Sequence, residues 1–376
     1  MKIKLNRSVI KRVIIMVFVI VLIITLPTIK LASDDNMELI FRSFVGKKSD
    51  YQGFIEIWNI DTFESGKMTK SDFLQSVAKE FQKENKGTYV IVRNVTENEC
   101  KNMIASGQRP DLVSCSYGVA AEIKQYVSSF LVKADNVYEN FLNAGKFNGE
   151  QYAIPWCFGN YYLLSTKSRV QEYFDENEDI KLSKIALSTG KEKVGKKKTE
   201  IIHSLGFGSK KYLLPKTAFC TYTKAEIVSA NYAVNKTSAI ASTPYSAYTE
   251  FLTHKFNILL GTQSELNKLK NRESLGKLEK LLFERVDGFT DLLQFIFMLS
   301  NSKERFDYSK KFIEFLISEK IQKGVLKTGL LPINKKVVLG DKEGVMSNII
   351  PEKIESYECF NVFLNKAEIE NLQAIQ

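Results

Sequence analysis

The hydrophobic pattern of residues 54–127 alternates between short apolar runs and longer stretches with one apolar face. The short runs are rich in β-branched residues and predict buried strands, whereas apolar positions at helical spacing predict amphipathic helices. The predicted strands are Phe54–Ile60, Tyr89–Val95 and Asp111–Cys115, and the predicted helices are Thr69–Glu84, Glu97–Ser106 and Val119–Val127. This βαβαβ order favours a parallel sheet with helices on both faces.

The pattern is less regular toward the C-terminus. Strands are predicted at Tyr152–Pro155, Tyr161–Ser165 and Lys255–Gly261, each of which is a short apolar run. Phe289–Ser300 (FTDLLQFIFMLS) is apolar enough for a core helix, and Phe306–Gln322 has the spacing of an amphipathic helix. The stretch between the second and third of these strands shows no clear period.

The N-terminus carries a separate signal. Residues 13–29 read VIIMVFVIVLIITLPTI, hold no charge and follow five cations. This arrangement is typical of a membrane-directed segment whose start stays inside the cell. As a helix it spans about 25 Å, slightly less than the roughly 30 Å of a bilayer core. A cleaved signal peptide and a retained anchor both stay open, with a buried core helix less favoured. The first two place residues 34–376 outside the cytoplasm.

The length of the chain indicates its number of domains, and its charge distribution limits the kinds of partner that it binds. A chain of 376 residues corresponds to two or three domains. The formal net charge is +10, but the first 30 residues hold six cations and no acid, which leaves +4 for the rest. A near-neutral body argues against nucleic-acid binding, which requires a concentrated basic face. The basic run Gly190–Lys198 is most simply a solvated loop.

Signatures of catalysis and of cofactor binding are missing from the sequence. It has no HExxH, no paired CxxC, no phosphate-binding loop and no G-x-S-x-G elbow, and its histidines are His203 and His254. We therefore expect no metal, no cofactor and no catalytic residue. The five cysteines are odd in number and are most simply buried free thiols, although one bridged pair stays open.

Five segments carry a family resemblance. They are IEIWN with the helix after it (55–85), IASGQRPDLVSCSYG (104–118), FNGEQYAIPWCFGNYYLLSTK (147–167), FNILLGTQSEL (256–266) and the helical region 286–336. In this order they resemble the extracellular solute-binding proteins of ABC importers, in particular the sugar-binding family that includes maltose-binding protein. Two features depart from the family pattern. Residues 165–215 lack its usual Pro-x-Thr-Trp-x-Glu-like helix start, and no lipobox cysteine follows the apolar N-terminal run.

The resemblance implies an α/β protein with a two-lobe, periplasmic-binding-protein-like fold. Each lobe is expected to be a mixed, mostly parallel sheet flanked by helices, and the lobes close on a ligand by hinge bending. The expected division is a membrane-directed segment at 1–33, a stalk at 34–50, the first lobe at 51–130, the second lobe at 131–255, a return to the first lobe at 256–305 and a C-terminal helical region at 306–376.

Candidate ligand-binding residues follow the predicted strand ends, because ligands of open α/β sheets sit beyond the carboxyl ends of the strands. A sugar has apolar faces that aromatic rings cover and a hydroxyl rim that polar groups satisfy. The candidates are Trp58, Asn59, Ser116, Tyr117, Trp156, Phe158, Tyr161, Thr262 and Gln263. Trp156 follows a proline at the expected lobe crossing, so we expect it to face the cleft.

Plainer roles stay open for several of these candidates. Trp58 is equally suited to packing in the core. Ser116 and Tyr117 follow a strand, where they also suit the chemistry of a turn. Thr262 and Gln263 also suit the cap of a helix that begins after the strand.

The sequence therefore predicts a non-catalytic, extracytoplasmic substrate-binding protein of a carbohydrate ABC transporter. We expect a monomer that holds a sugar or oligosaccharide between two hinged lobes and delivers it to permease subunits in the membrane, with no nucleic acid as partner. Two alternatives stay open. One is a membrane-tethered ligand-sensing or degenerate solute-binding module, and the other is a surface-glycan hydrolase with paired carboxylates.

Overall fold

The computed structural model describes part of the chain in detail. The described residues are 51–171, 180–182, 193–194, 197–198, 205–207, 240–241, 244–299, 302–337, 351 and 353–364. The predicted membrane-directed segment and the stalk lie outside this part. Within it, no helix is both long and apolar enough to cross a bilayer. The signal peptide or anchor therefore stays a prediction from the sequence.

Two compact units divide the chain: residues 1–54 with 82–89, and residues 55–81 with 90–376. Every residue of the candidate site and of the contacts discussed below belongs to the larger unit. That unit contains strands from two separate sheets. We call the six-stranded sheet with its helices the first lobe, and the five-stranded sheet with its helices the second lobe.

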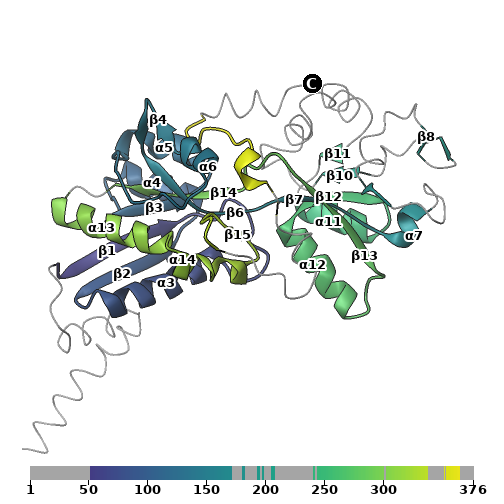
Figure 1. Ribbon diagram of the computed structural model, residues 1–376, viewed down its shortest axis with the longest axis horizontal. Helices are drawn as coiled ribbons and strands as arrows, with labels where there is room; N and C mark the ends of the chain where they lie inside the picture. Colours follow the sequence, from purple (N-terminus) through teal and green to yellow (C-terminus); the bar gives the residue numbers. More distant parts are fainter. Residues whose placement is uncertain are drawn as a thin grey trace, which may run out of the picture. The chain divides into compact units, whose positions relative to one another are not determined.

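The sheet of the first lobe has the strand order β15-β6-β14-β3-β1-β2 (Figure 1). Its strands are β1 (Gly53–Asn59), β2 (Thr88–Asn94), β3 (Leu112–Cys115), β6 (Ala153–Phe158), β14 (Leu293–Met298) and β15 (Leu331–Pro332). β1 and β3 are parallel, whereas β14 is antiparallel to both β3 and β6. The sheet is mixed, as expected, but less parallel than the sequence indicated, because an antiparallel strand lies in its middle.

Helices flank this sheet. They are α3 (Lys70–Glu84), α4 (Glu97–Ala105), α5 (Val119–Ile123), α6 (Glu139–Ala144), α13 (Lys303–Leu316) and α14 (Glu319–Gln322), with the 3₁₀ turns η1 (Lys124–Tyr126), η4 (Val325–Thr328) and η5 (Ile354–Ser356). α3 buries its predicted apolar face, and its Phe81 ring meets Phe312 of α13 at 5.3 Å between centroids. Thr96 begins α4 through a capping box with Glu99, which satisfies two backbone donors.

The apolar run 289–300 contains a strand and is not the predicted core helix. β14 lies between β3 and β6, and every one of its residues is buried. A continuous apolar run fits a strand that is covered on both faces as well as it fits a core helix, so hydrophobicity alone does not separate them. The first residues of the run lead into the strand from the other lobe, which made the run long enough to suggest a helix.

The sheet of the second lobe has the order β11-β10-β12-β7-β13 (Figure 1). Its strands are β7 (Tyr161–Thr166), β10 (Leu205–Phe207), β11 (Ile240–Ala241), β12 (Ile258–Thr262) and β13 (Leu281–Val286), and its helices are α7 (Lys167–Val170), α11 (Pro244–Leu252) and α12 (Gln263–Ser274). A core that includes Tyr162, Phe251, Leu259 and Leu266 joins β7, β12, α11 and α12. Two hairpins complete the described strands: β4 (Lys146–Phe147) with β5 (Glu150–Gln151), and β8 (Lys193–Val194) with β9 (Lys197–Lys198).

The chain passes between the two sheets at two crossings. The first crossing, Gly159–Asn160, links β6 to β7, and the second crossing, residues 287–292, links β13 to β14. The two crossings are bonded to each other. Gly159 N donates to Leu292 O at 2.7 Å, and Thr290 Oγ1 donates to Gly159 O at 2.7 Å. The crossings therefore lie side by side.

These crossings differ from the expected lobe boundaries at 131 and 256. β6, which was expected in the second lobe, pairs within the first sheet, and β12 and β13, which were expected in the return to the first lobe, belong to the second sheet. Hydrophobic patterns identify strands, but hydrogen bonds between distant segments decide which sheet a strand joins. The segment 147–167, which the resemblance assigned to a lobe crossing, does contain the first crossing.

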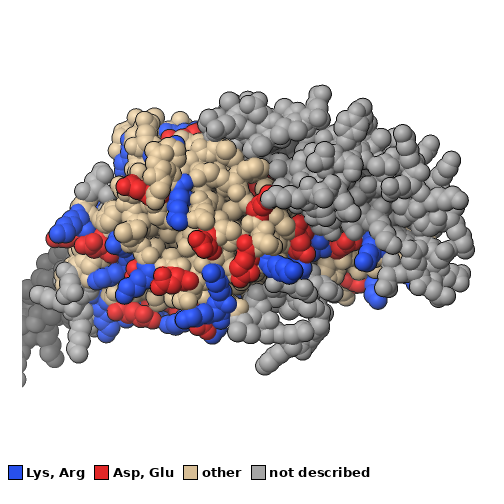
Figure 2. All heavy atoms as spheres, turned by 45° about the horizontal axis from the view of Figure 1, so that its top comes forward, with Lys and Arg blue, Asp and Glu red and all other residues tan. Residues whose placement is uncertain are grey.

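The surface of the described part carries both signs of charge. On the face shown in Figure 2, acidic and basic side chains are interspersed, and neither sign forms a continuous patch. This agrees with the low net charge that the sequence assigns to the chain after its N-terminal segment.

The four described cysteines are free thiols. Cys100, Cys115 and Cys157 are buried, and Cys359 is half-buried. Burial raises the pKa of Cys100 to about 11 and raises the pKa of Cys115 well above its usual range. Thiols with such values stay protonated and unreactive near neutral pH. The prediction of buried free thiols is confirmed for the first three, and Cys220 lies outside the described residues.

Candidate functional site

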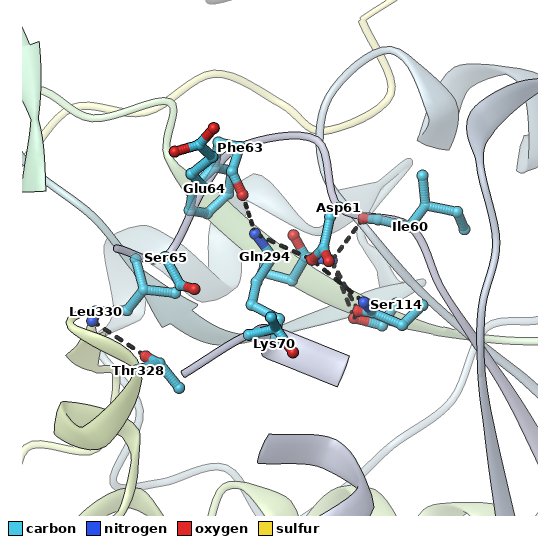
Figure 3. Close-up of polar contacts among 12 residues, drawn as sticks. Ile60, Asp61, Phe63, Glu64, Ser65, Lys70, Ser114, Gln294, Thr328 and Leu330 are labelled. Atoms are coloured by element: carbon cyan, nitrogen blue, oxygen red, sulfur yellow. Dashed lines mark hydrogen bonds and ion pairs between the residues drawn. The ribbon is translucent and has the colours of Figure 1, made fainter. Parts of the chain in front are cut away.

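A cluster of buried polar side chains lies on neighbouring strands of the first lobe (Figure 3). Asn59 ends β1, its cross-strand partner Ser114 lies on β3, and Gln294 lies on β14, the strand next to β3. All three side chains are fully buried. Because these strands are adjacent, residues from three distant parts of the sequence come within hydrogen-bonding distance.

Hydrogen bonds connect this polar cluster. Gln294 Nε2 donates to Ser114 Oγ at 3.0 Å and to Ile60 O at 3.1 Å. Ser114 Oγ donates to Asn59 Oδ1 at 3.0 Å, and Trp156 Nε1 donates to Ser114 Oγ at 3.2 Å. A buried network of this kind restricts the rotamers of its members and holds the end of β1 in a defined position.

Several buried polar atoms have no hydrogen-bond partner among the described residues. Three such groups are Gln294 Oε1 in the cluster, Thr62 Oγ1 on the loop after β1, and both side-chain polar atoms of Asn160 on the first crossing. Elsewhere such atoms occur singly, as with Thr166 Oγ1 and Ser309 Oγ. An unsatisfied buried amide costs about 1–3 kcal/mol, and buried polar groups are almost always paired with protein, water or ligand. Fully buried Asn160, on the first crossing, is therefore the strongest candidate for a ligand contact.

The loop after β1, residues 60–69, is held by a buried lysine. Lys70 begins α3 and is 1% exposed. Its ammonium donates to Phe63 O, lies 3.4 Å from Asp61 Oδ1 and lies 3.8 Å from the centroid of the Phe63 ring. A buried ammonium needs such partners to replace its lost water. Figure 3 shows these side chains beside Gln294, so Lys70 sets the shape of the loop next to the polar cluster.

The same loop contacts the start of α12 in the second lobe. Gln263 Nε2 donates to Glu64 O at 3.1 Å, and Gln263 Oε1 accepts from Asn160 N at 3.0 Å. Thr262 is the N-cap of α12, and the carboxylate of Glu265 accepts from its backbone N at 2.9 Å and from its hydroxyl at 2.7 Å. Gln263 thus joins the loop, the first crossing and the helix.

Three of the aromatic side chains predicted to bind the ligand lie in the core of the first lobe. Trp58 is 1% exposed and donates from Nε1 to Glu56 Oε1 at 3.0 Å. Trp156 is completely buried and stacks on Phe73, with 5.6 Å between ring centroids and 9° between planes. Phe158, on the same strand as Trp156, is also fully buried. The expectation that these rings cover the face of a sugar is therefore corrected, since all three side chains are buried in the first lobe.

The other predicted residues have partners of several kinds. Asn59 and Gln263 take part in the contacts described above, and Thr262 caps α12. Ser116 is buried after β3. Tyr161 OH donates to Asp291 Oδ1 at 2.9 Å, and Tyr117 OH donates to Phe360 O at 2.8 Å. Burial raises the pKa of Tyr117 well above its usual range, so its phenol stays a neutral donor.

Sequence reasoning missed Asn160, Gln294 and Lys70. Gln294 had a signal, because it is a single amide inside the apolar run LLQFIFML. Asn160 lies just beyond the predicted phenylalanine at the end of β6, but nothing in the pattern separates it from an ordinary turn residue. Lys70 had no signal, because a lysine at the start of a helix is normally exposed.

The chemistry of the unpaired groups is that of neutral polar recognition. Amides and hydroxyls both donate and accept, as sugar hydroxyls do. The nearby carboxylates of Asp61 and Glu64 already face lysines, at 3.4 Å from Lys70 and 2.7 Å from Lys268. Within the described ranges, no three His, Cys, Asp or Glu side chains gather closely enough to hold a metal ion.

Comparison with known proteins finds similarity in structure and not in sequence. No known family profile matches the chain, and no curated sequence matches it. The GacH receptor of Streptomyces glaucescens, solved with acarbose, superposes with a TM-score of 0.60 at 16% identity, over 86% of this chain and 92% of its own. UgpB from Mycobacterium tuberculosis, in complex with glycerophosphocholine, superposes with a TM-score of 0.60 at 14% identity, over 86% of this chain and 93% of its own. Iron-bound HitA from Pseudomonas aeruginosa superposes with a TM-score of 0.56 at 13% identity, over 85% of this chain and 98% of its own.

These structures are two-lobe binding proteins, and the chain has their fold. The predicted fold class is thereby confirmed, and the resemblance noted in the sequence holds at the level of the fold. At such low identity, the fold does not carry the ligand with it. The three structures illustrate this, because they were solved with acarbose, with glycerophosphocholine and with iron.

Proposed function

We propose that this chain is a non-catalytic, extracytoplasmic solute-binding protein that holds a sugar or oligosaccharide where the chain crosses between its lobes. The observation that carries the proposal is the pair of fully buried amides, Asn160 and Gln294, with polar atoms that lack partners among the described residues. Asn160 lies on the first crossing, and Gln294 is the second residue of β14, the strand that follows the second crossing. A ligand bound there contacts the first lobe and the crossing that leads into the second lobe, which is where hinge bending acts.

The kind of unpaired group favours a neutral hydroxylated ligand. Asn160 offers a donor and an acceptor, Gln294 Oε1 offers an acceptor, and the hydroxyl of Thr62 offers both. A sugar hydroxyl satisfies either kind of group without bringing a charge that needs a partner. Two proteins with this fold were solved with acarbose and with maltotetraose, so the fold is able to hold a carbohydrate.

The proposed place of action is the outer side of the cell membrane. The charge-free run 13–29 behind five cations directs the chain to the membrane, as a signal peptide or as an anchor. The proposed partners are the solute and the permease subunits of an ABC importer, with the protein acting as a monomer.

Calorimetric titration of the full chain in detergent tests the function. The panel contains neutral oligosaccharides, glycerophosphocholine and ferric iron, so each ligand class seen with this fold is represented. We expect saturable heat with an oligosaccharide only. A response to iron or glycerophosphocholine alone would refute the carbohydrate, and release of shorter sugars during the titration would favour the hydrolase alternative instead.

A further inference from the structure

A charged contact joins the loop after β1 to α12 of the second lobe. Glu64 Oε2 accepts from Lys268 Nζ at 2.7 Å and from Ser264 Oγ at 2.8 Å. Gln263 adds the hydrogen bond from its Nε2 to Glu64 O at 3.1 Å. One residue of the first lobe thus meets three residues from the first two turns of a helix in the second lobe.

Two glycines of the first lobe lie close to α12. Gly66 has a φ of +96°, and a Cβ at this position would lie 2.9 Å from Ser264 Cα. Gly329 has a φ of +86°, and a Cβ there would lie 2.8 Å from both Asn267 Nδ2 and Ser65 O. Glycine tolerates such dihedrals and leaves the space that a side chain would fill. Gly66 and Gly329 therefore leave room for α12, in addition to the side-chain contact between Glu64 and Lys268.

The charged pair of Glu64 and Lys268 is partly exposed to solvent. The hydrogen bond from Lys268 lowers the pKa of Glu64, and the charge of Lys70 on α3 acts in the same direction. Glu265 Oε1 lies 3.9 Å from the Lys268 ammonium on its other side, and the ring of Tyr248 on α11 lies 5.9 Å away. The side chain of Glu64 is 65% exposed and that of Lys268 is 44% exposed, so salt reaches the pair.

We infer that Glu64, Ser264 and Lys268 form a latch that sets how readily the two lobes part. The inference rests on the proposed function, because parting of the lobes is the step that admits and releases a solute. Glu64 and Gly66 act as positioning residues, since neither needs to touch the solute. An exposed pair of this kind shifts a two-state equilibrium by about two- to fivefold.

Pulsed electron–electron double resonance on the full chain in detergent measures the distance between spin labels on the two lobes in the absence of ligand. Spin labels are attached through unnatural ketone side chains at Lys79 on α3 and at Leu275 after α12, both of which are exposed. This leaves the native thiols untouched. We expect Glu64→Gln to raise the long-distance population about two- to fivefold, and Gly66→Ala to raise it further.

Gly107→Ala is the matched control for Gly66→Ala. Gly107 also has a positive φ, +88°, but a Cβ there would meet nothing within 4 Å. The two variants share the backbone strain, and only Gly66→Ala disturbs the approach to α12. We expect no change in lobe separation for Gly107→Ala. Equal shifts in both variants would overturn the latch, and so would unchanged distances in Glu64→Gln and Gly66→Ala.

Salt and pH separate the ion pair from other effects of substitution. Because the folded-state pKa of Glu64 is lowered, the contact is complete above the ordinary pKa of a glutamate and is lost as the pH falls through the lowered value. Low pH and about 1 M NaCl, which shortens the Debye length to about 3 Å, should each open the wild-type chain. Neither should act on Glu64→Gln, and an equal response of that variant would contradict the latch.

The outcomes also keep the latch apart from the proposed function. Opening by Glu64→Gln in a chain that binds no oligosaccharide would refute the proposed function alone. Oligosaccharide binding in a chain whose lobe separation ignores Glu64 would refute the latch alone.

Discussion

Trp156 and Asn160 lie four residues apart and are both fully buried, yet their surroundings differ in kind. Trp156 stacks on Phe73, and its Nε1 donates to Ser114. The side chain of Asn160 has no partner for either polar atom among the described residues. The difference teaches that burial alone does not separate core from site in this molecule. What sets Asn160 apart is that both polar atoms of its buried amide are unpaired among the described residues, which a folded chain rarely leaves so.

The two environments arise from the path of the chain. Trp156 belongs to β6, which lies between β15 and β14 in the sheet and whose residues are all buried. Asn160 lies where the chain has left that sheet and has not yet entered β7. Its backbone N still donates to Gln263, so the segment is held in place while the side chain stays available.

The largest expected effect is on the core side of this comparison. Trp156→Ala should lower the free energy of unfolding by about 3–5 kcal/mol, as removal of a fully buried aromatic ring does. Urea denaturation measures the loss, and calorimetry on the remaining folded protein should give an unchanged sugar affinity. Tyr245→Ala is the control, because this ring is 80% exposed. Weakened binding at unchanged stability would return Trp156 to the site.

Lys70→Met tests the support of the loop beside the cluster. The substitution removes the ammonium that faces Phe63 O and Asp61, and we expect a loss of about 1–3 kcal/mol in the free energy of unfolding. Urea denaturation measures it. Lys79→Met, at an exposed position of the same helix, should change stability by less than about 0.5 kcal/mol. Equal effects of the two substitutions would mean that Lys70 does not hold the loop.

A smaller effect distinguishes two similar helix caps. Thr96 and Thr262 each form a capping box, at the starts of α4 and α12. Replacement of either by alanine should lower the free energy of unfolding by about 1 kcal/mol. Sugar affinity should fall only for Thr262→Ala, because Gln263, the next residue, contacts the first crossing. A fall of the same size for Thr96→Ala would show that the loss is one of general stability.

Much of the first lobe was predictable from the sequence because its elements have clear local periods. The helix predicted at Thr69–Glu84 is observed at Lys70–Glu84, and the strand predicted at Tyr89–Val95 is observed at Thr88–Asn94. The strand β14 and the lobe boundaries were not predictable. Both depend on pairing between segments more than a hundred residues apart, as between Ile296 and Ser114.

The candidate site was predictable only in part. The rule that ligands sit beyond strand ends led to Asn59 and Gln263, which do lie in the polar contacts. It also led to Trp58 and Trp156, because it locates a position along the chain and not the direction of a side chain. Successive residues of a strand point to opposite faces, and the sequence does not say which face is covered. Asn160 became visible only through its missing partners.

The most direct test of the central claim compares stability and binding in Asn160→Leu. Urea denaturation gives the free energy of unfolding, and calorimetry uses the oligosaccharide with the strongest response in the panel. We predict a free energy of unfolding that is unchanged or raised by up to about 3 kcal/mol, because an unpaired buried amide is replaced by an apolar side chain of similar size. We also predict binding that is weaker by about tenfold to a hundredfold. Lost stability with intact sugar affinity would contradict the claim and make Asn160 part of the core.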